Sequence, residues 1–283
     1  MSLSRRLSDA LVWALCGLAL LLVIIPTVDI IVGIVVQSAP SWSWKLLTTP
    51  THGVAGGLQN AILGTIVLIV GTVVVAGFVG VLGGIYLAEL SGQRTGALLR
   101  FFSEVLAGIP SIVIGYVGYV ALVITLGWGF SMLAGVLALS IMIMPYIMKT
   151  TEASFRQIPN TYREAYVALG LPRVVGLQKV LLPPAIPGVL TGLVVALAIA
   201  MGETAPLIYT AGWTNALPPH QLTHQPIAYL TYVVWAYTNQ PFAQSHALAN
   251  SAALSLIILL LVLILASRLM SWQSRRFTTR MQA

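Results

Sequence analysis

Charged side chains are scarce in this sequence. Of its 283 residues, 7% are Asp, Glu, Lys or Arg, and 58% are apolar. Soluble domains carry roughly a quarter charged residues. So few charges cannot cover the surface of a 30.2 kDa particle in water, which excludes a soluble globular protein. We therefore expect lipid to be the solvent for most of the chain.

Several signatures of chemistry are also missing. The single cysteine, Cys16, allows no intrachain disulfide and no zinc or redox motif. His220 and His224 are four residues apart, but the loop around them is rich in proline and does not favour a metal site. No Gly-x-x-x-x-Gly-Lys-[Ser/Thr] string occurs, so the chain cannot cradle ATP phosphates itself. We expect a non-catalytic protein with no metal or cofactor of its own.

Long apolar windows, by contrast, are abundant. A bilayer core about 30 Å thick takes roughly 20 helical residues. Six windows of about this length or longer contain at most one charged residue each: residues 10–36, 61–87, 105–126, 131–148, 188–210 and 247–267. The first is too long for the core of a signal peptide and should remain as an anchor. The sequence thus predicts an all-α, polytopic membrane protein with six transmembrane helices.

The basic residues predict its orientation. Lys and Arg near the ends of spans are retained on the cytoplasmic side. With the N-terminus inside, thirteen of the fourteen basic residues fall in cytoplasmic segments and Lys45 alone falls outside. The opposite orientation would invert that ratio, so we predict an N-in/C-in topology. The long connections are then external at residues 37–60 and 211–246 and cytoplasmic at residues 149–187.

These features divide the chain into three parts. Residues 1–60 form an N-terminal anchor helix and the first external segment. Residues 61–272 form a transmembrane domain that includes the cytoplasmic segment 149–187, and residues 273–283 form a basic cytoplasmic tail. Residues 211–246, the longest external segment, are expected to contribute to contacts with an external partner.

The cytoplasmic segment 149–187 has an apolar periodicity that is unusual for a loop. Ala165, Ala168 and Leu169 form an i, i+3, i+4 face, and Gly170 is placed to end that helix. Two interpretations remain open. The segment lies on the membrane surface, or its apolar face docks into a groove on a cytoplasmic partner.

A second short helix should follow in this segment. The apolar residues from Leu177 to Leu182 favour it. Pro183 and Pro184 come directly after them, and proline inside a helix removes a hydrogen bond. The sequence therefore predicts that this helix stops at the two prolines.

At these residues the sequence resembles the permeases of ATP-binding-cassette (ABC) importers. Their signature is Glu-Ala-Ala, three residues, Gly, nine residues, an aliphatic residue, any residue and Leu-Pro. Here Glu164-Ala165 precedes Gly170, and after nine residues the string ends in Leu182-Pro183. The second Ala is replaced by a tyrosine. The resemblance implies a type I ABC importer (MetI-like) permease fold, coupled to a separate ATPase through Glu164, Ala165, Ala168, Leu169, Gly170, Leu182 and Pro183.

A narrower resemblance is to the PstA family of phosphate-importer permeases, at five strings. These are Gly84-Ile85-Tyr86-Leu87-Ala88-Glu89, Pro110-Ser111-Ile112-Val113-Ile114-Gly115, Lys149-Thr150-Thr151-Glu152, Gly202-Glu203-Thr204-Ala205-Pro206-Leu207 and Gln225-Pro226-Ile227-Ala228. The resemblance implies inorganic phosphate as substrate and a prokaryotic inner or plasma membrane as location. It implies as partners a PstC-like permease in a heterodimer, a PstB-like ATPase dimer that binds ATP and Mg²⁺, and an external PstS-like phosphate-binding protein.

Glu203 lies within an apolar window, where a carboxylate costs several kcal/mol unless it is protonated, paired or facing a cavity. Gly202 permits close approach of another backbone, and Pro206 removes an N–H, so we predict a helix break here. We hypothesise that Glu203 lines the translocation path and accepts a hydrogen bond from the phosphate hydroxyl. The alternative is a protonated Glu203 that is bonded to a neighbouring helix.

An anion path also needs donors. Thr204 and Thr210 offer hydroxyls, and we add Lys149 and Glu152 to the predicted path. Related permeases often carry an arginine three residues before the Gly of the Gly-Glu-Thr-Ala-Pro string, where this chain has Ile199. Lys149 can instead pair with Glu152 or reach the inner membrane surface. We therefore expect the partner permease to supply most of the positive charge.

Two other functions remain possible on sequence grounds. One is an ABC permease for another oxyanion or small solute. The other is a secondary transporter that works without ATP, which inverted repeats with broken helices would favour. The sequence has no convincing internal repeat.

Overall fold

The computed structural model describes residues 3–53 and 55–280, and most of them are helical. The N-terminal part consists of α1 (Leu3–Ser38), the 3-10 helix η1 (Ala39–Ser41), α2 (Trp44–Thr48), β1 (Thr51–His52) and β2 (Ala55–Gly56). The central part consists of α3 (Gln59–Thr72), η2 (Val73–Gly77), α4 (Phe78–Ile85), η3 (Tyr86–Leu90), α5 (Gln93–Gly108), α6 (Ser111–Gly118), η4 (Tyr119–Thr125) and α7 (Met132–Arg156). The C-terminal part consists of α8 (Asn160–Ala168), α9 (Arg173–Gly176), η5 (Leu177–Leu181), α10 (Leu182–Gly202), α11 (Ala205–Thr210), α12 (Leu230–Thr238) and α13 (Ala243–Arg280). The segments η2 to η5 are π-helical.

Four of the six predicted spans are confirmed as single long apolar helical stretches. They are Leu11–Ser41, Gln59–Leu90, Met132–Arg156 and Ala243–Ala266. Each is long enough to cross the hydrocarbon core of a bilayer, because a helix rises about 1.5 Å per residue. The second of them joins α3, η2, α4 and η3 into one continuous span.

The predicted span over residues 105–126 is not one continuous helix. The chain forms two helical stretches instead, Gln93–Gly108 and Ser111–Thr125, and they are bent by 96° with respect to each other. The bend falls at Ile109 and Pro110. Ile109 is extended, with φ −72° and ψ 129°, as expected for a residue before proline. A hydropathy window does not detect this bend, because both sides of it are apolar.

The predicted span over residues 188–210 also differs from the structure. The long helical stretch runs from Arg173 to Gly202, so the helix does not stop at Pro183 and Pro184. Both prolines come at the start of α10, directly after the π-helical segment η5. The change from π-helical to α-helical geometry thus coincides with the two residues that lack an N–H. At the other end the helix stops at Gly202, and α11 is a separate helix. The described residues thus contain five long candidate spans, or six if the bent pair is one span.

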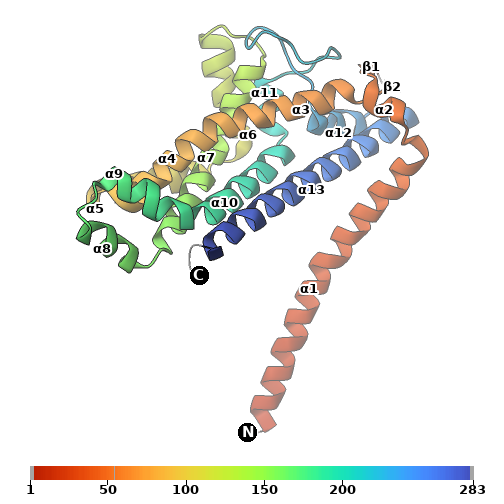
Figure 1. The fold of residues 1–283 in the computed structure, drawn as a ribbon. Coiled ribbons are helices and arrows are strands. Elements are labelled where there is room, and N and C mark those ends of the chain that lie inside the picture. Colours follow the sequence, from red (N-terminus) through yellow and green to blue (C-terminus); the bar gives the residue numbers. More distant parts are fainter. Residues whose placement is uncertain (1–2, 54, 281–283) are drawn as a thin grey trace.

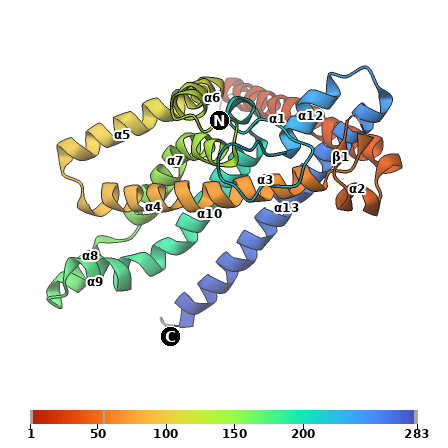
Figure 2. The same cartoon turned by 90° about the horizontal axis from the view of Figure 1, so that it is seen from above.

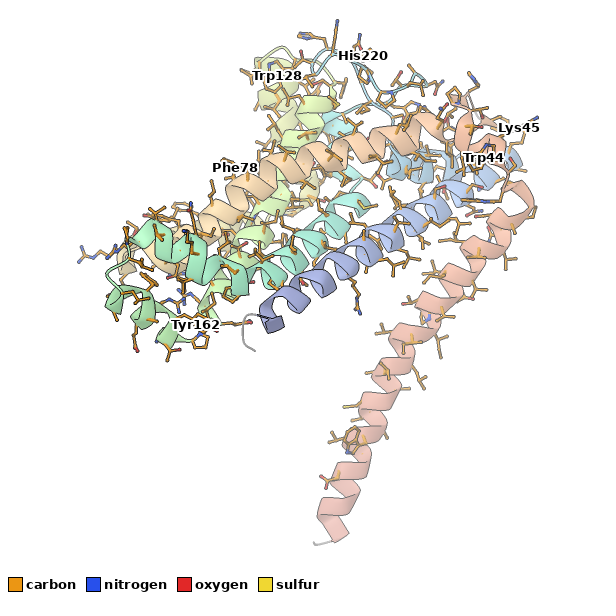
Figure 3. The ribbon with its side chains drawn as sticks, in the orientation of Figure 1. Trp44, Lys45, Phe78, Trp128, Tyr162 and His220 are labelled. Atoms are coloured by element: carbon orange, nitrogen blue, oxygen red, sulfur yellow. The ribbon has the colours of Figure 1, made fainter. Side chains whose placement is uncertain are left out.

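The long helices lie side by side, and the two ends of the bundle differ (Figure 1). The short helices α8 and α9 lie at one end, whereas α2, β1 and β2 lie at the other, as the second view also shows (Figure 2). The labelled side chains follow this division, with Trp44 and Lys45 at one end and Tyr162 at the opposite end (Figure 3). The predicted direction across the membrane stays a prediction.

Helix α1 diverges from the bundle (Figure 1). It is joined to α13 near Ser38, where Asn250 Nδ2 donates to Gln37 Oε1 at 2.9 Å. Just beyond α1, the hydroxyls of Ser41 and Ser251 are 3.0 Å apart. Its apolar window has no buried residue, and both Cys16 and Asp29 lie on exposed parts of it.

A small antiparallel hairpin was not predicted. Thr51 pairs with Gly56 and His52 with Ala55, and the turn residue Gly53 has φ +57°. Asn60 Oδ1 accepts hydrogen bonds from the backbone N and the hydroxyl of Thr51, both at 3.0 Å. The all-α class is otherwise confirmed for the described residues.

The side chains of several basic residues lie outside the described part of the structure. The backbone of α13 continues to Arg280, so residues 273–280 of the predicted tail extend the last helix. Residues 281–283 lie outside the described residues. The side chains that the structure does not describe include Arg5, Arg6, Arg275, Arg276 and Arg280.

Candidate functional site

Helix α8 has an outer and an inner face. Of its nine residues, Arg163 and Tyr166 are the two that are partly buried, and the others are exposed. Glu164, Ala165 and Ala168 therefore point outward, and Leu169 just after the helix is 75% exposed. An apolar face without an intramolecular partner is compatible with both interpretations, the membrane surface and a groove on another chain.

The predicted end of this helix is confirmed. Gly170 has φ +66°, a conformation that glycine adopts without strain. Its N–H donates to Val167 O at 2.9 Å, and the N–H of Leu171 donates to Tyr166 O at 3.1 Å, as in a glycine-terminated helix. The predicted coupling residues Leu182 and Pro183 lie at the start of α10, and α9 and η5 separate them from α8.

Three acidic residues at this end of the bundle are held in ion pairs. Glu89 pairs with Arg163, which donates from Nη2 to Oε1 at 2.5 Å and from Nε to Oε2 at 3.1 Å. Glu152, whose side chain is 10% exposed, pairs with Arg100 at 2.7 Å and with Arg156 at 2.9 Å. The third acid, Glu104, forms an exposed pair with Lys149.

The alternative in which Lys149 pairs with Glu152 is not what the structure shows. Lys149 Nζ lies 3.9 Å from Glu104 Oε1, and both side chains are mostly exposed. Both residues face α5, but they meet different residues of it. Glu152 contacts Arg100, which also donates to the carbonyl of Leu87 at 3.1 Å.

The helix break predicted around Glu203 is present and complete. Glu203 is extended, with φ −76° and ψ 134°, and α11 begins two residues later with Pro206 in its first turn. The hydroxyl of Thr231 donates to the backbone carbonyl of Glu203 at 2.9 Å. A side chain from α12 thus satisfies a carbonyl that the broken helix leaves without a helical donor.

The break lies where five helical segments meet. A small pocket of about 10 Å³ lies there, roughly the room that one water molecule needs. Among the described residues, no side chain forms an ion pair or a hydrogen bond with the carboxylate of Glu203. The cavity is lined by Thr65, Leu68, Ile69, Leu139, Ala200, Met201, Glu203, Leu207, Tyr229 and Thr231.

Lys149 and Glu152, the two other charged residues of the predicted path, do not lie near Glu203. Gly192 lies against Thr150 and Gly188 against Ser154, so Lys149 lies level with about residue 193 of α10. Ten residues of helix separate that level from Glu203, which is roughly 15 Å. Glu152 lies still farther toward α8.

The two threonines of the predicted path differ. Thr204, in the break, is partly buried, whereas Thr210 is fully buried. The hydroxyl of Thr210 already donates to Pro206 O at 2.7 Å. Gly202 is exposed, and a Cβ added to it would meet no atom within 4 Å. The open side of the break is therefore the side of Gly202.

Ile199 has an apolar environment. It packs against a buried cluster that includes Ala196 and Met201, together with Leu260 of α13. A guanidinium at this position would lack solvation, because its neighbours are apolar. The substitution of the usual arginine thus agrees with local packing.

Sequence reasoning missed the partners of these side chains. Glu89 and Arg163 stood in or beside recognised strings, yet the pair joins residues 74 positions apart. Arg100 was counted as a topology signal. No local spacing rule connects such residues, because their contact depends on how the spans pack. The roles of the predicted site residues in transport stay predictions.

Comparison with known proteins identifies the family. The family model described as "Binding-protein-dependent transport system inner membrane component" matches residues 80–279. The phosphate transport system permease protein PstA 2 of Mycobacterium bovis is 52% identical over 272 residues, which cover 96% of this chain and 90% of the relative. The phosphate transport system permease protein PstA of Xylella fastidiosa is 36% identical over 225 residues, 78% of this chain and 76% of the relative.

A solved structure has the same fold. The chain from an inward-facing conformation of the MetNI methionine ABC transporter superposes with a TM-score of 0.61. The match covers 82% of this chain and 96% of that chain at 20% sequence identity. The expected MetI-like permease fold is therefore confirmed. The candidate spans make the chain a multi-pass membrane protein. The match over residues 80–279 shows that it belongs to the family of binding-protein-dependent transport system inner membrane components.

Proposed function

We propose that this chain is the transmembrane permease subunit of an ATP-driven importer of inorganic phosphate. The observation that carries the proposal is its 52% identity, over 96% of its length, to a phosphate transport system permease protein. Membership of a binding-protein-dependent family argues against a secondary transporter that works without ATP. Within that family, the substrate of the relatives favours phosphate over another oxyanion.

The chain works with three kinds of partner. A PstC-like permease completes a heterodimeric translocation path, a PstB-like ATPase dimer binds ATP and Mg²⁺, and an external PstS-like protein delivers phosphate. The sequence has no phosphate-cradling ATP motif of its own. A division of labour between permease and ATPase accounts for this, and ATP hydrolysis is then supplied by the ATPase.

The outer face of α8 is the docking surface for the ATPase. Its exposed Ala165, Ala168 and Leu169 present an apolar stripe suited to a groove. The carboxylate of Glu164 is exposed beside it. Closure of the ATPase dimer moves α8, and the spans rock between inward-open and outward-open states.

Glu203 discriminates between anions by their protonation state. Its carboxylate accepts hydrogen bonds, so it binds an anion that carries a hydroxyl and repels one that does not. Monohydrogen phosphate and dihydrogen phosphate carry such a proton, and sulfate does not. The extended backbone at Glu203 and the exposed Gly202 beside it support a position on the path.

Positive charge for the anion comes mainly from the partner permease. Ile199 is packed among apolar side chains, and Lys149 is roughly 15 Å from Glu203 along the helix axes. A path that binds its anion weakly also favours release, because tight binding would hold the substrate in the membrane.

Uptake of labelled phosphate into liposomes that contain the full complex tests the proposal. Wild-type complex should take up phosphate only with ATP, with arsenate competing and sulfate not. Glu203→Gln should lower phosphate uptake by about tenfold, the loss of one charged hydrogen bond, whereas Glu104→Gln, an exposed acid, should not. Phosphate uptake and sulfate exclusion that are both unchanged in Glu203→Gln would remove the role of Glu203. ATP-driven uptake of a different solute would overturn phosphate as the substrate.

A further inference from the structure

The ion pair between Glu89 and Arg163 is the most extensive polar contact between α8 and the membrane spans. The guanidinium donates from two nitrogens to the two carboxylate oxygens, at 2.5 Å and 3.1 Å. The side chains are 8% exposed for Glu89 and 23% for Arg163. A bidentate, largely buried pair of this kind fixes orientation as well as distance.

Arg163 also holds the end of α7. Its Nη2 donates to the carbonyl of Phe155 at 2.9 Å, and its Nη1 donates to the carbonyl of Ile158 at 2.8 Å. Nη1 lies 3.4 Å from Asn160 Oδ1 as well. One side chain therefore joins the end of α7, the start of α8 and the end of η3. The hydrogen bond with Glu89 raises the pKa of Arg163, against the opposing effect of burial, so the guanidinium remains charged.

Two side chains connect α8 to the spans. Arg163 and Tyr166 are its two partly buried residues, and Tyr166 packs on Gly176 and on the cluster formed by Phe155, Ile158 and Leu181. Tyr166 supplies the apolar contact. Arg163 supplies the directional one, because its hydrogen bonds require a defined geometry.

The span that ends at Glu89 reaches the helix break. It is continuous from Gln59 to Leu90. Near its other end, Thr65 lines the cavity beside Glu203 and accepts a hydrogen bond from the N–H of Leu230 at 2.9 Å. Thr65 and Glu89 are 24 residues apart, a length of roughly 36 Å.

This span has little freedom to slide on α7. A Cβ added to Gly84 would lie 2.5 Å from Thr151 Cβ, and one added to Gly80 would lie 2.8 Å from Ile147 Cβ. Two helices in such close contact move together, because packed interfaces shift between discrete arrangements rather than deform smoothly. A displacement applied at Glu89 is therefore carried along the whole span.

We propose that the Glu89–Arg163 pair is the positioning contact that passes the movement of α8 to the span Gln59–Leu90 and so to the helix break at Glu203. The inference rests on the proposed function for the origin of that movement. It makes Glu89 and Arg163 positioning residues, since neither touches the substrate or ATP.

The first test compares transport with ATP hydrolysis in the full complex. Glu89→Gln and Arg163→Gln should lower the phosphate transported per ATP by about fivefold or more, while the ATPase is still retained and still hydrolyses ATP. Arg163→Lys keeps the positive charge and loses the bidentate hydrogen bonds of the guanidinium. Its phosphate transported per ATP should lie between that of these two variants and that of the wild type. The double exchange Glu89→Arg with Arg163→Glu should recover part of the ratio, because it restores the ion pair without the contacts to the α7 carbonyls.

The matched control is Glu104→Gln, which removes an acid from an exposed pair and should keep the wild-type ratio. A wild-type ratio in Glu89→Gln overturns the inference. The inference is also overturned if Glu89→Gln and Arg163→Lys both lose ATPase binding and both lose thermal stability. The pair would then be a structural contact alone.

A second measurement does not depend on the substrate. Cys16→Ser removes the only cysteine, so spin labels can be placed at Val167 in α8 and Leu63 in α3, both exposed positions. The distance distribution between them should stay narrow with and without ATP, because α8 and the span move together. In Glu89→Gln it should broaden or shift when ATP is added, and an unchanged distribution contradicts the inference. If the wild type shows this coupled behaviour but imports no phosphate, the proposed substrate fails while the inference stands.

Discussion

The ring of Tyr166 in α8 lies directly over Gly176 in α9. A Cβ added at residue 176 would be 2.5 Å from Cδ2 of the ring and 2.7 Å from Cγ. Tyr166 stands where related permeases carry a second alanine, and Gly176 provides the space that the larger side chain needs. The lack of a side chain at Gly176 thus accommodates the tyrosine, and the contact between the two residues joins α8 to α9.

Gly176→Ala is therefore expected to displace the Tyr166 ring and with it α8. Uptake should fall by severalfold, and combining Gly176→Ala with Tyr166→Ala should restore part of it, because the added methyl group then has room. Gly17→Ala serves as the control, since a Cβ there would meet no atom within 4 Å. Equal uptake by Gly176→Ala and Gly17→Ala would contradict the expectation.

Leu169→Asp should separate docking from folding. Leu169 is 75% exposed, so a charge there costs the isolated chain little stability, whereas a charge in an apolar docking groove is costly. Co-purification should show loss of the ATPase at an unchanged melting temperature. Leu217→Asp, at a 49% exposed residue in the loop before α12, should retain the ATPase. Retention by Leu169→Asp as well would exclude this face from the docking surface.

Glu152 and Lys149, adjacent in the recognised string, should respond differently to alanine. Glu152→Ala leaves Arg100 and Arg156 without their shared carboxylate, and we expect a loss of about 2–4 kcal/mol of stability for a partly buried network. Lys149→Ala removes an exposed pair at 3.9 Å and should change stability by less than about 1 kcal/mol. Thermal unfolding in detergent measures both. A larger loss in Lys149→Ala than in Glu152→Ala would mean that the ion pairs are assigned wrongly.

Two buried tyrosines offer a matched comparison. Tyr237 donates its hydroxyl to Gly53 O at 2.5 Å, whereas no group of the described protein bonds to the hydroxyl of Tyr229. Tyr237→Phe should cost about 1 kcal/mol for the lost hydrogen bond, and Tyr229→Phe should cost less or stabilise the fold. The comparison needs only the melting temperatures of the two variants. The reverse order would show that Tyr229 has a partner in the assembled membrane complex.

The spans were predictable where the length of an apolar run alone decides that the segment crosses the membrane. A run of apolar residues about 30 Å long must be solvated by lipid, so residues 61–87 and 247–267 were recognised without knowledge of packing. The end of α8 at Gly170 was also predictable, because the positive φ that glycine adopts is a local property of the chain. The family resemblance added the fold and the outward face of α8.

Features that depend on direction or on distant contacts were not predictable. Pro110 and Pro183 look alike in sequence, yet one stands at a 96° bend and the other in the first turn of a helix. Proline is compatible with both, and only the packing of the neighbouring helices decides. Proximity in sequence left a Lys149–Glu152 pair as one alternative, and it gave no sign of Arg100, which lies 52 residues from Glu152.

The π-helical turn η3 makes the coupling end of the second span tolerant of one extra residue. A π-helix bonds each residue to the fifth one along rather than the fourth, so it holds one residue more than an α-helical turn. An extra residue inside a regular α-helix would rotate everything beyond it by about 100°. In Tyr86–Leu90 the wider turn absorbs that residue. The span therefore keeps its packing on α7 while Glu89 still faces Arg163.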